Sequence, residues 1–281
     1  MLRCLLLVML SATTAAFAQS DTLGKIRNSG TITLGYRADA VPFSFKGTDE
    51  RPTGFSVDIC QRVVAGLARS LKLPGLKASW VPVSSENRIE QVSSGKVDLE
   101  CGTTTVTLGR QAQVDFSLIT FLDGAAFIAR GSGSAPRSPQ ELRGARVAVS
   151  AGTTTEKELR KMVAESGSGA EVVTVANHIE GVSQLIDGKV AMYAADRTVL
   201  NGLLMNAGKV APLQLLDFQF SYEPYALMMR RDADFRLAVN RELAAVFRDG
   251  EIKAIYGKWF GQFGPPQPLL QSLYVIQSFR E

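Results

Sequence analysis

This 281-residue sequence contains little of several features that would assign a function at once. It has three cysteines and one histidine, and its charged residues are interspersed without a run of five or more like charges. We find no nucleophile motif, no metal-ligand spacing and no phosphate-binding loop. These absences argue against nucleic acid as a partner, and no metal or cofactor is expected. The net charge of +4 is better interpreted as a diffuse field that favours anionic ligands.

Long apolar runs are also missing. Beyond the first residues, no run reaches the roughly 18 apolar residues that a membrane helix needs. At the start, Arg3 precedes the apolar residues 5–10, and Ala16-Phe17-Ala18 has the pattern of an A-x-A cleavage site. We therefore expect residues 1–18 to be a signal peptide cleaved after Ala18, and the mature protein to be periplasmic. Cys4 precedes the apolar run, so a lipid anchor is not expected.

Cleavage would leave two cysteines, Cys60 and Cys101. In an oxidising compartment they could form a disulfide that closes a loop of about 40 residues. Alternatively, Cys60 is a small core residue on the apolar face of a helix and Cys101 ends a buried strand. The sequence does not decide between these two interpretations.

The composition, with 46% hydrophobic and 21% charged residues, is that of a globular protein long enough for two domains of roughly 100–150 residues. Residue periodicity predicts a strand at 31–36, a helix after Gly54, a strand at 77–83, a short helix at 87–94 and a strand at 97–101. A second unit repeats this order from residue 146 to residue 194. This is an α/β pattern, whose ligand crevice lies at the carboxyl ends of the parallel strands. The proline-rich tail from residue 264 is expected on the surface.

The stretch 84–110 contains the most informative chemistry. Arg88 and Arg110 flank a loop of three hydroxyl residues, Thr103 to Thr105. A guanidinium meets a carboxylate with two parallel charge-assisted hydrogen bonds, and hydroxyl and backbone N–H groups can satisfy the remaining lone pairs. The local chemistry suits a carboxylate ligand.

Two segments, SENRIEQV (85–92) and GKVDLECGTTT (95–105), followed by Arg110, resemble the ligand-binding core of periplasmic amino-acid-binding proteins of ABC importers. The likeness is to the glutamate/aspartate-binding branch and extends from about residue 23 to about residue 268. It implies a two-lobed periplasmic binding protein (type II) with hinge-linked mixed and parallel sheets. Lobe 1 would comprise residues 19–125 and 228–281, and lobe 2 would comprise residues 126–227 with both hinge crossings.

The resemblance also assigns residues. It implies that Arg110, with Thr103 and Thr105, binds the ligand α-carboxylate and that Asp196 binds the α-ammonium group. By sequence alone, Arg110 would more often be a solvated arginine, and Asp196 would be the N-cap of the next helix.

The same resemblance implies that Arg37 and Arg88, assisted by Ser85, bind the side-chain carboxylate of the ligand. Binding proteins for neutral or basic amino acids have no use for extra buried guanidinium groups, because an unpaired buried charge is costly. His178 matches a ligand-contacting histidine of the family, although a lone histidine is usually structural.

Gly152 to Glu156 joins a strand to a helix, whose N-terminus offers free N–H groups to an anion. The family likeness implies ligand contacts from Thr153 and Thr154. Thr153 and Glu156 also form a capping-box pattern, which would use the hydroxyl internally. The chain departs from the branch at Thr103, where serine is usual, and at Ala226, where many members have glycine.

We therefore expect a monomeric solute-binding protein that closes on an acidic amino acid and delivers it to the membrane permease of an ABC transporter, without catalysis. One alternative is an enzyme on the same fold, such as a cyclohexadienyl dehydratase-like protein with Glu100 or Glu86 as the acid or base. Another is a soluble sensory subunit. The sequence does not distinguish glutamate from aspartate, glutamine or another dicarboxylate.

Overall fold

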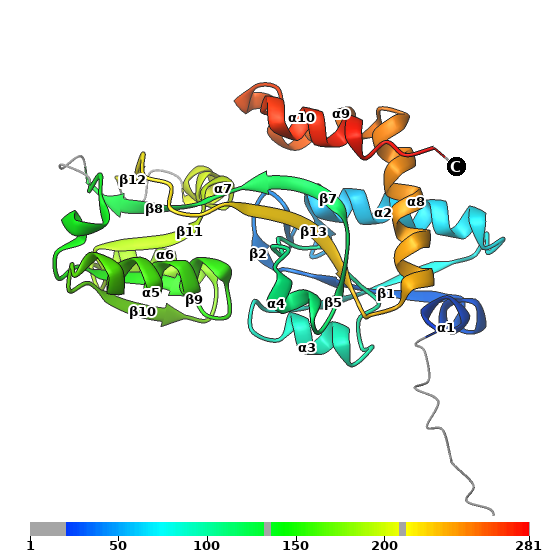
Figure 1. Ribbon diagram of the computed structural model, residues 1–281, viewed down its shortest axis with the longest axis horizontal. Helices are drawn as coiled ribbons and strands as arrows, with labels where there is room; N and C mark the ends of the chain where they lie inside the picture. Colours follow the sequence, from blue (N-terminus) through cyan, green and yellow to red (C-terminus); the bar gives the residue numbers. More distant parts are fainter. Residues whose placement is uncertain (1–20, 132–135, 208–211, 281) are drawn as a thin grey trace, which may run out of the picture.

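The computed structural model describes residues 21–131, 136–207 and 212–280, and it folds into two lobes, each built on a five-stranded sheet (Figure 1). The expected signal peptide and its cleavage point lie outside the described residues. Within the described part, none of the helices combines the length and apolarity needed to span a bilayer. The two-lobed α/β architecture predicted from the sequence is confirmed.

The sheet of lobe 1 combines parallel and antiparallel strands. The strand order is β5 (Lys77–Pro82), β1 (Thr31–Tyr36), β6 (Leu99–Glu100), β13 (Glu223–Met229) and β7 (Asp115–Asp123). Strand β1 runs parallel to β5 and β6, and β13 runs antiparallel to β6 and β7. A small sheet beside it contains β2 (Asp39–Ala40), β3 (Ser44–Lys46) and β4 (Pro52–Thr53).

The helices of lobe 1 come from both ends of the described chain. They are α1 (Thr22–Ser29), α2 (Phe55–Ser70), α3 (Arg88–Ser93), α4 (Leu108–Gln111), α8 (Ala233–Arg248), α9 (Glu251–Phe260) and α10 (Pro268–Ile276), with a 3-10 turn at Gly261–Phe263. In α2 the apolar residues recur three and four positions apart, which places them on one face against the core. Cys60 on that face forms a disulfide with Cys101, which resolves the alternatives left open by the sequence.

Lobe 2 repeats this plan. The strand order is β10 (Glu171–Val175), β9 (Arg146–Ser150), β11 (Met192–Asp196), β8 (Ala125–Arg130) and β12 (Leu213–Leu215). Strand β9 runs parallel to β10 and β11, and β8 runs antiparallel to β11 and β12. Its helices are α5 (Thr154–Ser166), α6 (His178–Ile186) and α7 (Arg197–Ala207), with a 3-10 turn at Pro139–Leu142. Separate apolar clusters cover the two faces of this sheet.

Two chain crossings join the lobes. The first passes through Gly124 between β7 and β8, and the second lies between β12 and β13 (Figure 1). The boundary expected between residues 227 and 228 falls inside β13, whose paired residues all lie in the sheet of lobe 1. The family resemblance implied that boundary, but residues 225–229 are apolar because they are buried in this sheet. The Phe220 N–H still donates to the Ala125 carbonyl of lobe 2, so we place the second crossing at residues 221–222.

The C-terminal tail is more structured than its prolines indicate. Residues 268–276 form α10, with Pro268 at the first helical position, where its missing N–H costs nothing. Leu270 and Tyr274 are buried, and the Tyr274 hydroxyl donates to the Thr120 carbonyl at 2.8 Å. The expectation of a surface tail was therefore wrong for this face of α10, although Val275 and Ile276 are exposed.

Candidate ligand site between the lobes

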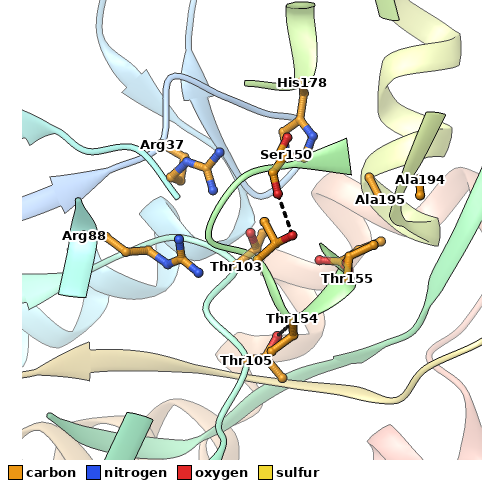
Figure 2. A pocket seen from close by; sticks show the side chains of 12 residues that line it. Arg37, Arg88, Thr103, Thr105, Ser150, Thr154, Thr155, His178, Ala194 and Ala195 are labelled. Atoms are coloured by element: carbon orange, nitrogen blue, oxygen red, sulfur yellow. Dashed lines mark hydrogen bonds between the residues drawn. The ribbon is translucent and has the colours of Figure 1, made fainter. Parts of the chain in front are cut away.

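The carboxyl ends of parallel strands from both sheets meet at the gap between the lobes. Arg37 follows β1 and Ser85 lies beyond β5, while Gly152 follows β9 and Asp196 ends β11. The space left in the gap is small, about 20 Å³, which is roughly the room that one water molecule needs. Figure 2 shows Arg37 and Arg88 on one side of it, with Thr155, Ala194 and Ala195 opposite. Eight of the ten predicted site residues line it: Arg37, Arg88, Thr103, Thr105, Thr153, Thr154, His178 and Asp196.

Arg88 and Arg110 approach the same point from lobe 1. Their Nη2 atoms donate to the Gly152 carbonyl oxygen of lobe 2 over 3.5 and 3.4 Å, respectively. Arg88 Nε also donates to Thr104 Oγ1 at 2.8 Å, and Arg110 Nη1 donates to the Thr105 carbonyl at 2.8 Å. Burial, together with the nearby charges of Arg110 and Arg37, lowers the pKa of Arg88 to about 9, so it stays charged at neutral pH. Arg110 does not line the gap but lies directly behind Thr105.

Arg37 is buried and partly neutralised. Its Nη2 is 3.2 Å from Asp39 Oδ1, while its Nε has no hydrogen-bond partner among the described residues. Ser85 is 1% exposed, and its Oγ likewise has no partner in the described part of the chain. Such buried polar atoms are uncommon and call for an explanation. Both are donors beside the gap, as an anion-binding position requires, although Ser85 does not line the gap itself.

Glu100 lies beneath these guanidinium groups without a hydrogen-bond partner among the described residues for either oxygen. Burial raises the pKa of this carboxyl, which favours its protonated form. In its protonated form Glu100 would leave the positive charge of the neighbouring arginines available to a ligand.

On the lobe 2 side, the turn after β9 has the structure of a capped helix. Thr153 Oγ1 accepts from the Glu156 N–H at 3.0 Å, and its hydroxyl donates to the Ser150 carbonyl at 2.8 Å. The Thr153 hydroxyl therefore acts internally, as the capping-box alternative predicted. Its neighbours in the first turn of α5 still have N–H groups without intrahelical partners, and these lie at the gap. Gly152 has φ +73°, and a side chain there would meet the Ser85 backbone of lobe 1.

Asp196 directly precedes α7, yet the Thr198 N–H in the first turn of that helix donates to Asp123, a residue of the crossing strand β7, at 3.1 and 3.3 Å. Asp196 faces the gap, where it accepts from Thr155 Oγ1 at 3.1 Å and from the Tyr225 hydroxyl. Burial and the neighbouring charge of Glu223 raise the pKa of Asp196 to about 6, and burial raises that of Asp123 to about 8. At neutral pH Asp123 therefore holds the proton and Asp196 carries the charge.

His178 is the first residue of α6 and is buried at the gap. Its ring Nδ1 is 2.6 Å from the Tyr193 hydroxyl, and its backbone N–H donates to Asp39 Oδ2 at 2.7 Å. Burial lowers the pKa of His178 to about 4, so the imidazole is neutral at pH 7. The Asp39 carboxylate thus joins Arg37 of lobe 1 to the first turn of a helix in lobe 2.

Two acidic residues that the sequence interpretation did not select take part in this region. Asp39 is one, and Glu223 in the first position of β13 is the other. Glu223 Oε2 accepts from Thr105 Oγ1 at 2.6 Å and from Thr154 Oγ1 at 2.7 Å. These two hydroxyls are therefore committed to a protein carboxylate in this structure. Two sequence signals could have identified these acids. Asp39 lies two residues after Arg37, and Glu223 is a single acid at the start of an otherwise apolar segment.

The site joins cationic donors from lobe 1 to an anionic acceptor and helix N-termini from lobe 2. Such an arrangement can hold a zwitterion with a further negative group. Among the described residues, no group of three or more His, Cys, Asp or Glu side chains is placed to hold a metal ion.

Residues 32–262 match the bacterial extracellular solute-binding proteins, family 3. Over 263 residues the chain is 36% identical to the L-glutamate/L-aspartate-binding protein of Pseudomonas aeruginosa, covering 93% of this chain and 87% of that protein. It is 30% identical over 256 residues to the glutamate/aspartate import solute-binding protein of Escherichia coli, covering 91% and 84%. An ancestral arginine-binding protein bound to arginine superimposes with a TM-score of 0.75 at 29% identity, covering 83% of this chain and 99% of that one. The ancestral amino-acid-binding protein AncCDT-1, a precursor of cyclohexadienyl dehydratase, gives the same TM-score at 27% identity, covering 85% and 100%.

Proposed function

The chain belongs to the bacterial extracellular solute-binding proteins, family 3, and from this we propose that it captures an acidic amino acid by closing its two lobes and delivers it to the permease of an ABC importer. Two of the relatives described above are named for glutamate and aspartate. We further propose that the protein acts as a monomer in the periplasm after removal of residues 1–18.

The observation that carries this proposal is the separation of charge across the gap. Arg88 lines the gap from lobe 1, with Arg110 beside it at the Gly152 carbonyl, and Asp196 faces the gap from lobe 2. An amino acid needs a cation for its α-carboxylate and an anion for its α-ammonium group. We assign the first role to Arg110 with backbone N–H groups of the threonine loop, and the second to Asp196.

A third cationic position distinguishes an acidic amino acid from a neutral one. Arg37 Nε and Ser85 Oγ are buried donors without partners among the described residues, and Arg88 is close enough to Arg37 for their charges to interact. We propose that Arg37, Ser85 and Arg88 bind the side-chain carboxylate, with His178 beside them. A neutral imidazole there adds no charge of its own and can act as a hydrogen-bond donor.

Closure provides the mechanism of capture. A ligand that contacts Arg110 and Arg88 of lobe 1 and Asp196 of lobe 2 makes its full set of interactions only in the closed form. It therefore shifts the equilibrium between open and closed lobes by its differential affinity for the two states. No covalent step is required. Closure also removes the ligand charges from water, so their paired partners in the protein are essential.

Catalysis by the same fold is the second candidate, because AncCDT-1 is described as a precursor of cyclohexadienyl dehydratase. The relatives with the higher identities are named as binding proteins. Two acids were considered for an enzymatic role, and neither lines the gap: Glu100 is fully buried beneath the arginines and Glu86 is exposed. Prolonged incubation with glutamate and aspartate, followed by product analysis, tests this candidate. Detectable turnover would support it against binding alone.

Calorimetric titration of the mature protein tests the proposed function. We expect glutamate or aspartate to bind more tightly than glutamine or dicarboxylates without an ammonium group. Arg88→Ala should weaken the preferred acidic ligand by roughly a hundredfold or more, since it leaves a buried charge unpaired. Glutamine should lose far less.

Arg62→Ala is a matched control, because Arg62 pairs with Glu251 on the surface of lobe 1. It should leave both affinities unchanged. Equal losses for glutamate and glutamine in Arg88→Ala would remove Arg88 from the side-chain role. Absence of binding to all acidic amino acids would reject the function itself.

A further inference from the structure

Glu223 occupies an unusual position for a charged residue. It is 1% exposed and opens β13 at the second crossing, directly opposite Asp123 of β7. Two carboxylates facing each other across a ladder would repel if both were charged. Burial and the nearby charge of Asp196 raise the pKa of Asp123 to about 8, which favours its protonated form at neutral pH. The chain thus accommodates an acid at its hinge rather than excluding one.

The partners of Glu223 come from three different parts of the molecule. Its Oε2 accepts from Thr105 of lobe 1 at 2.6 Å and from Thr154 of lobe 2 at 2.7 Å. Its Oε1 accepts from Ser221 in the crossing segment at 2.6 Å. One carboxylate oxygen therefore accepts a hydrogen bond from a hydroxyl group of each lobe. The other oxygen accepts from Ser221, and this bond holds the carboxylate at the hinge.

The contact with Thr154 depends on lobe closure. Thr154 is the first residue of α5 and belongs to lobe 2, whereas Glu223 is held in the sheet of lobe 1 by β13. Opening the lobes separates this pair but leaves the bond between Glu223 and Thr105 within lobe 1. The bond also places a negative charge at the N-terminus of α5, where the helix dipole favours it.

From this geometry we infer that Glu223 is a positioning residue that fastens the lobes in the closed state. It contacts the threonine hydroxyls at the edge of the gap and acts on ligand affinity through closure. The hydroxyl groups of Thr105 and Thr154 both donate to Glu223. These two residues therefore bind the α-carboxylate of the ligand through their backbone N–H groups. The inference rests on the proposed function only in taking closure as the step that retains the ligand.

Kinetics separates this role from general stabilisation. In Glu223→Ala we expect the dissociation rate of the bound amino acid to rise roughly tenfold to a hundredfold, the effect of one lost charge-assisted hydrogen bond. The association rate should change less than about threefold, because the ligand enters the open form. Thr154→Val should reproduce the faster dissociation, and the double variant should be no worse than either single variant. Glu223→Gln, which keeps one carbonyl acceptor, should recover part of the loss.

Glu90→Ala is the matched control, since Glu90 is an exposed acid of lobe 1 paired only with surface groups. Small-angle scattering of the ligand-free variants supplies a readout that does not depend on ligand identity. Glu223→Ala should shift the population toward a larger radius of gyration, whereas Glu90→Ala should not. If Glu223→Ala does not fold, Glu223→Gln and Thr154→Val carry the same comparison.

Unchanged dissociation and scattering in Glu223→Ala would overturn the inference. So would additive losses in the double variant, because independent effects would mean that Glu223 and Thr154 do not act as a pair. If the wild type bound no acidic amino acid, the proposed function would fail. The scattering comparison would then still decide whether Glu223 fastens the lobes.

Discussion

The two lobes share a strand plan but contribute different chemistry to the gap. Lobe 1 contributes the cationic side chains of Arg37 and Arg88, with Arg110 beside them at the Gly152 carbonyl, whereas lobe 2 contributes the first turns of α5 and α6 and the carboxylate of Asp196. Burial first, and then the nearby charges of Arg110 and Arg37, lower the pKa of Arg88. Lobe 1 therefore holds charges that lack full compensation, and an anionic ligand would supply part of what is missing. Lobe 2 supplies dipoles and one anion, which can complete the site only on closure.

The strongest test of this division is removal of the lobe 2 anion. Asp196→Asn should weaken glutamate binding by roughly a hundredfold to a thousandfold, because a buried ammonium group would lose its charged partner. Glutarate, a dicarboxylate without that group, should lose no affinity. Calorimetric titration of both ligands makes the measurement. Similar losses for glutamate and glutarate would contradict the assignment of Asp196 to the ammonium group.

The second test concerns the anchoring of the lobe 1 site loop. Cys60 in α2 is bonded to Cys101, which directly precedes the Gly102-to-Thr105 segment, with a sequence separation of 41. Replacing both cysteines with alanine should lower the free energy of unfolding by about 2–4 kcal/mol, mainly through the entropy of the unfolded chain. Chemical denaturation measures this loss. Hydrogen exchange should accelerate at residues 97–110 of lobe 1, while lobe 2, which contains no cysteine, serves as the internal control.

The third test uses pH. The pKa of Asp196 is raised to about 6 in the ligand-free protein, and a bound ammonium group would favour the charged form and lower it. Binding must therefore release a proton below pH 6, and affinity should fall toward tenfold per pH unit as the pH decreases from 6 to 5. The Asp196 titration should add no further change between pH 7 and 8. His178, with a pKa of about 4, remains neutral throughout.

The same pH series on Asp196→Asn should be nearly flat. Titrations in two buffers of different ionisation enthalpy would count the released proton directly. An affinity independent of pH down to 5 in the wild type would show that Asp196 does not titrate on binding.

The smallest expected effect comes from the contact between lobes away from the site. Gly202 lies within α7, and a Cβ there would be 2.5 Å from the Val41 carbonyl oxygen of lobe 1. Gly202→Ala should improve the helix by up to about 1 kcal/mol yet hinder full closure, so ligand affinity should fall a few-fold while thermal stability is retained. Gly257→Ala in α9, which has no neighbouring atom within 4 Å of the added Cβ, is the control. Equal affinities in both variants would indicate that the lobes do not approach this closely in the ligand-bound form.

The two-lobed α/β fold followed from the sequence because periodicity defines strands and helices, and the family likeness supplied the order. The second crossing was placed too late because a buried hinge strand and a core strand are both apolar. The tail from residue 264 was misjudged because its prolines lie at and before the start of α10 rather than within it.

For the candidate site, the sequence identified residues at strand ends but not how their hydrogen bonds are distributed. Thr153 uses its hydroxyl to cap α5, and Thr105 donates its own to Glu223. The cap is a local contact that the capping-box pattern predicted, whereas the bond to Glu223 joins segments far apart in the chain. Asp39 and Glu223 were missed for the same reason, since neither belongs to a local motif. The ligand roles of the ten predicted residues remain predictions until the variants described above are measured.

The placement of β13 bears on the order in which the protein can be assembled. All five strands of the lobe 2 sheet lie between residues 125 and 215, so this lobe can complete its sheet as one continuous segment. The lobe 1 sheet needs Glu223–Met229 between β6 and β7 before those strands are connected. Synthesis begins at the N-terminus, so lobe 1 starts to form first but is completed last. The strand ends that bear its arginines are held in a complete sheet only after β13, which is synthesised more than 100 residues later.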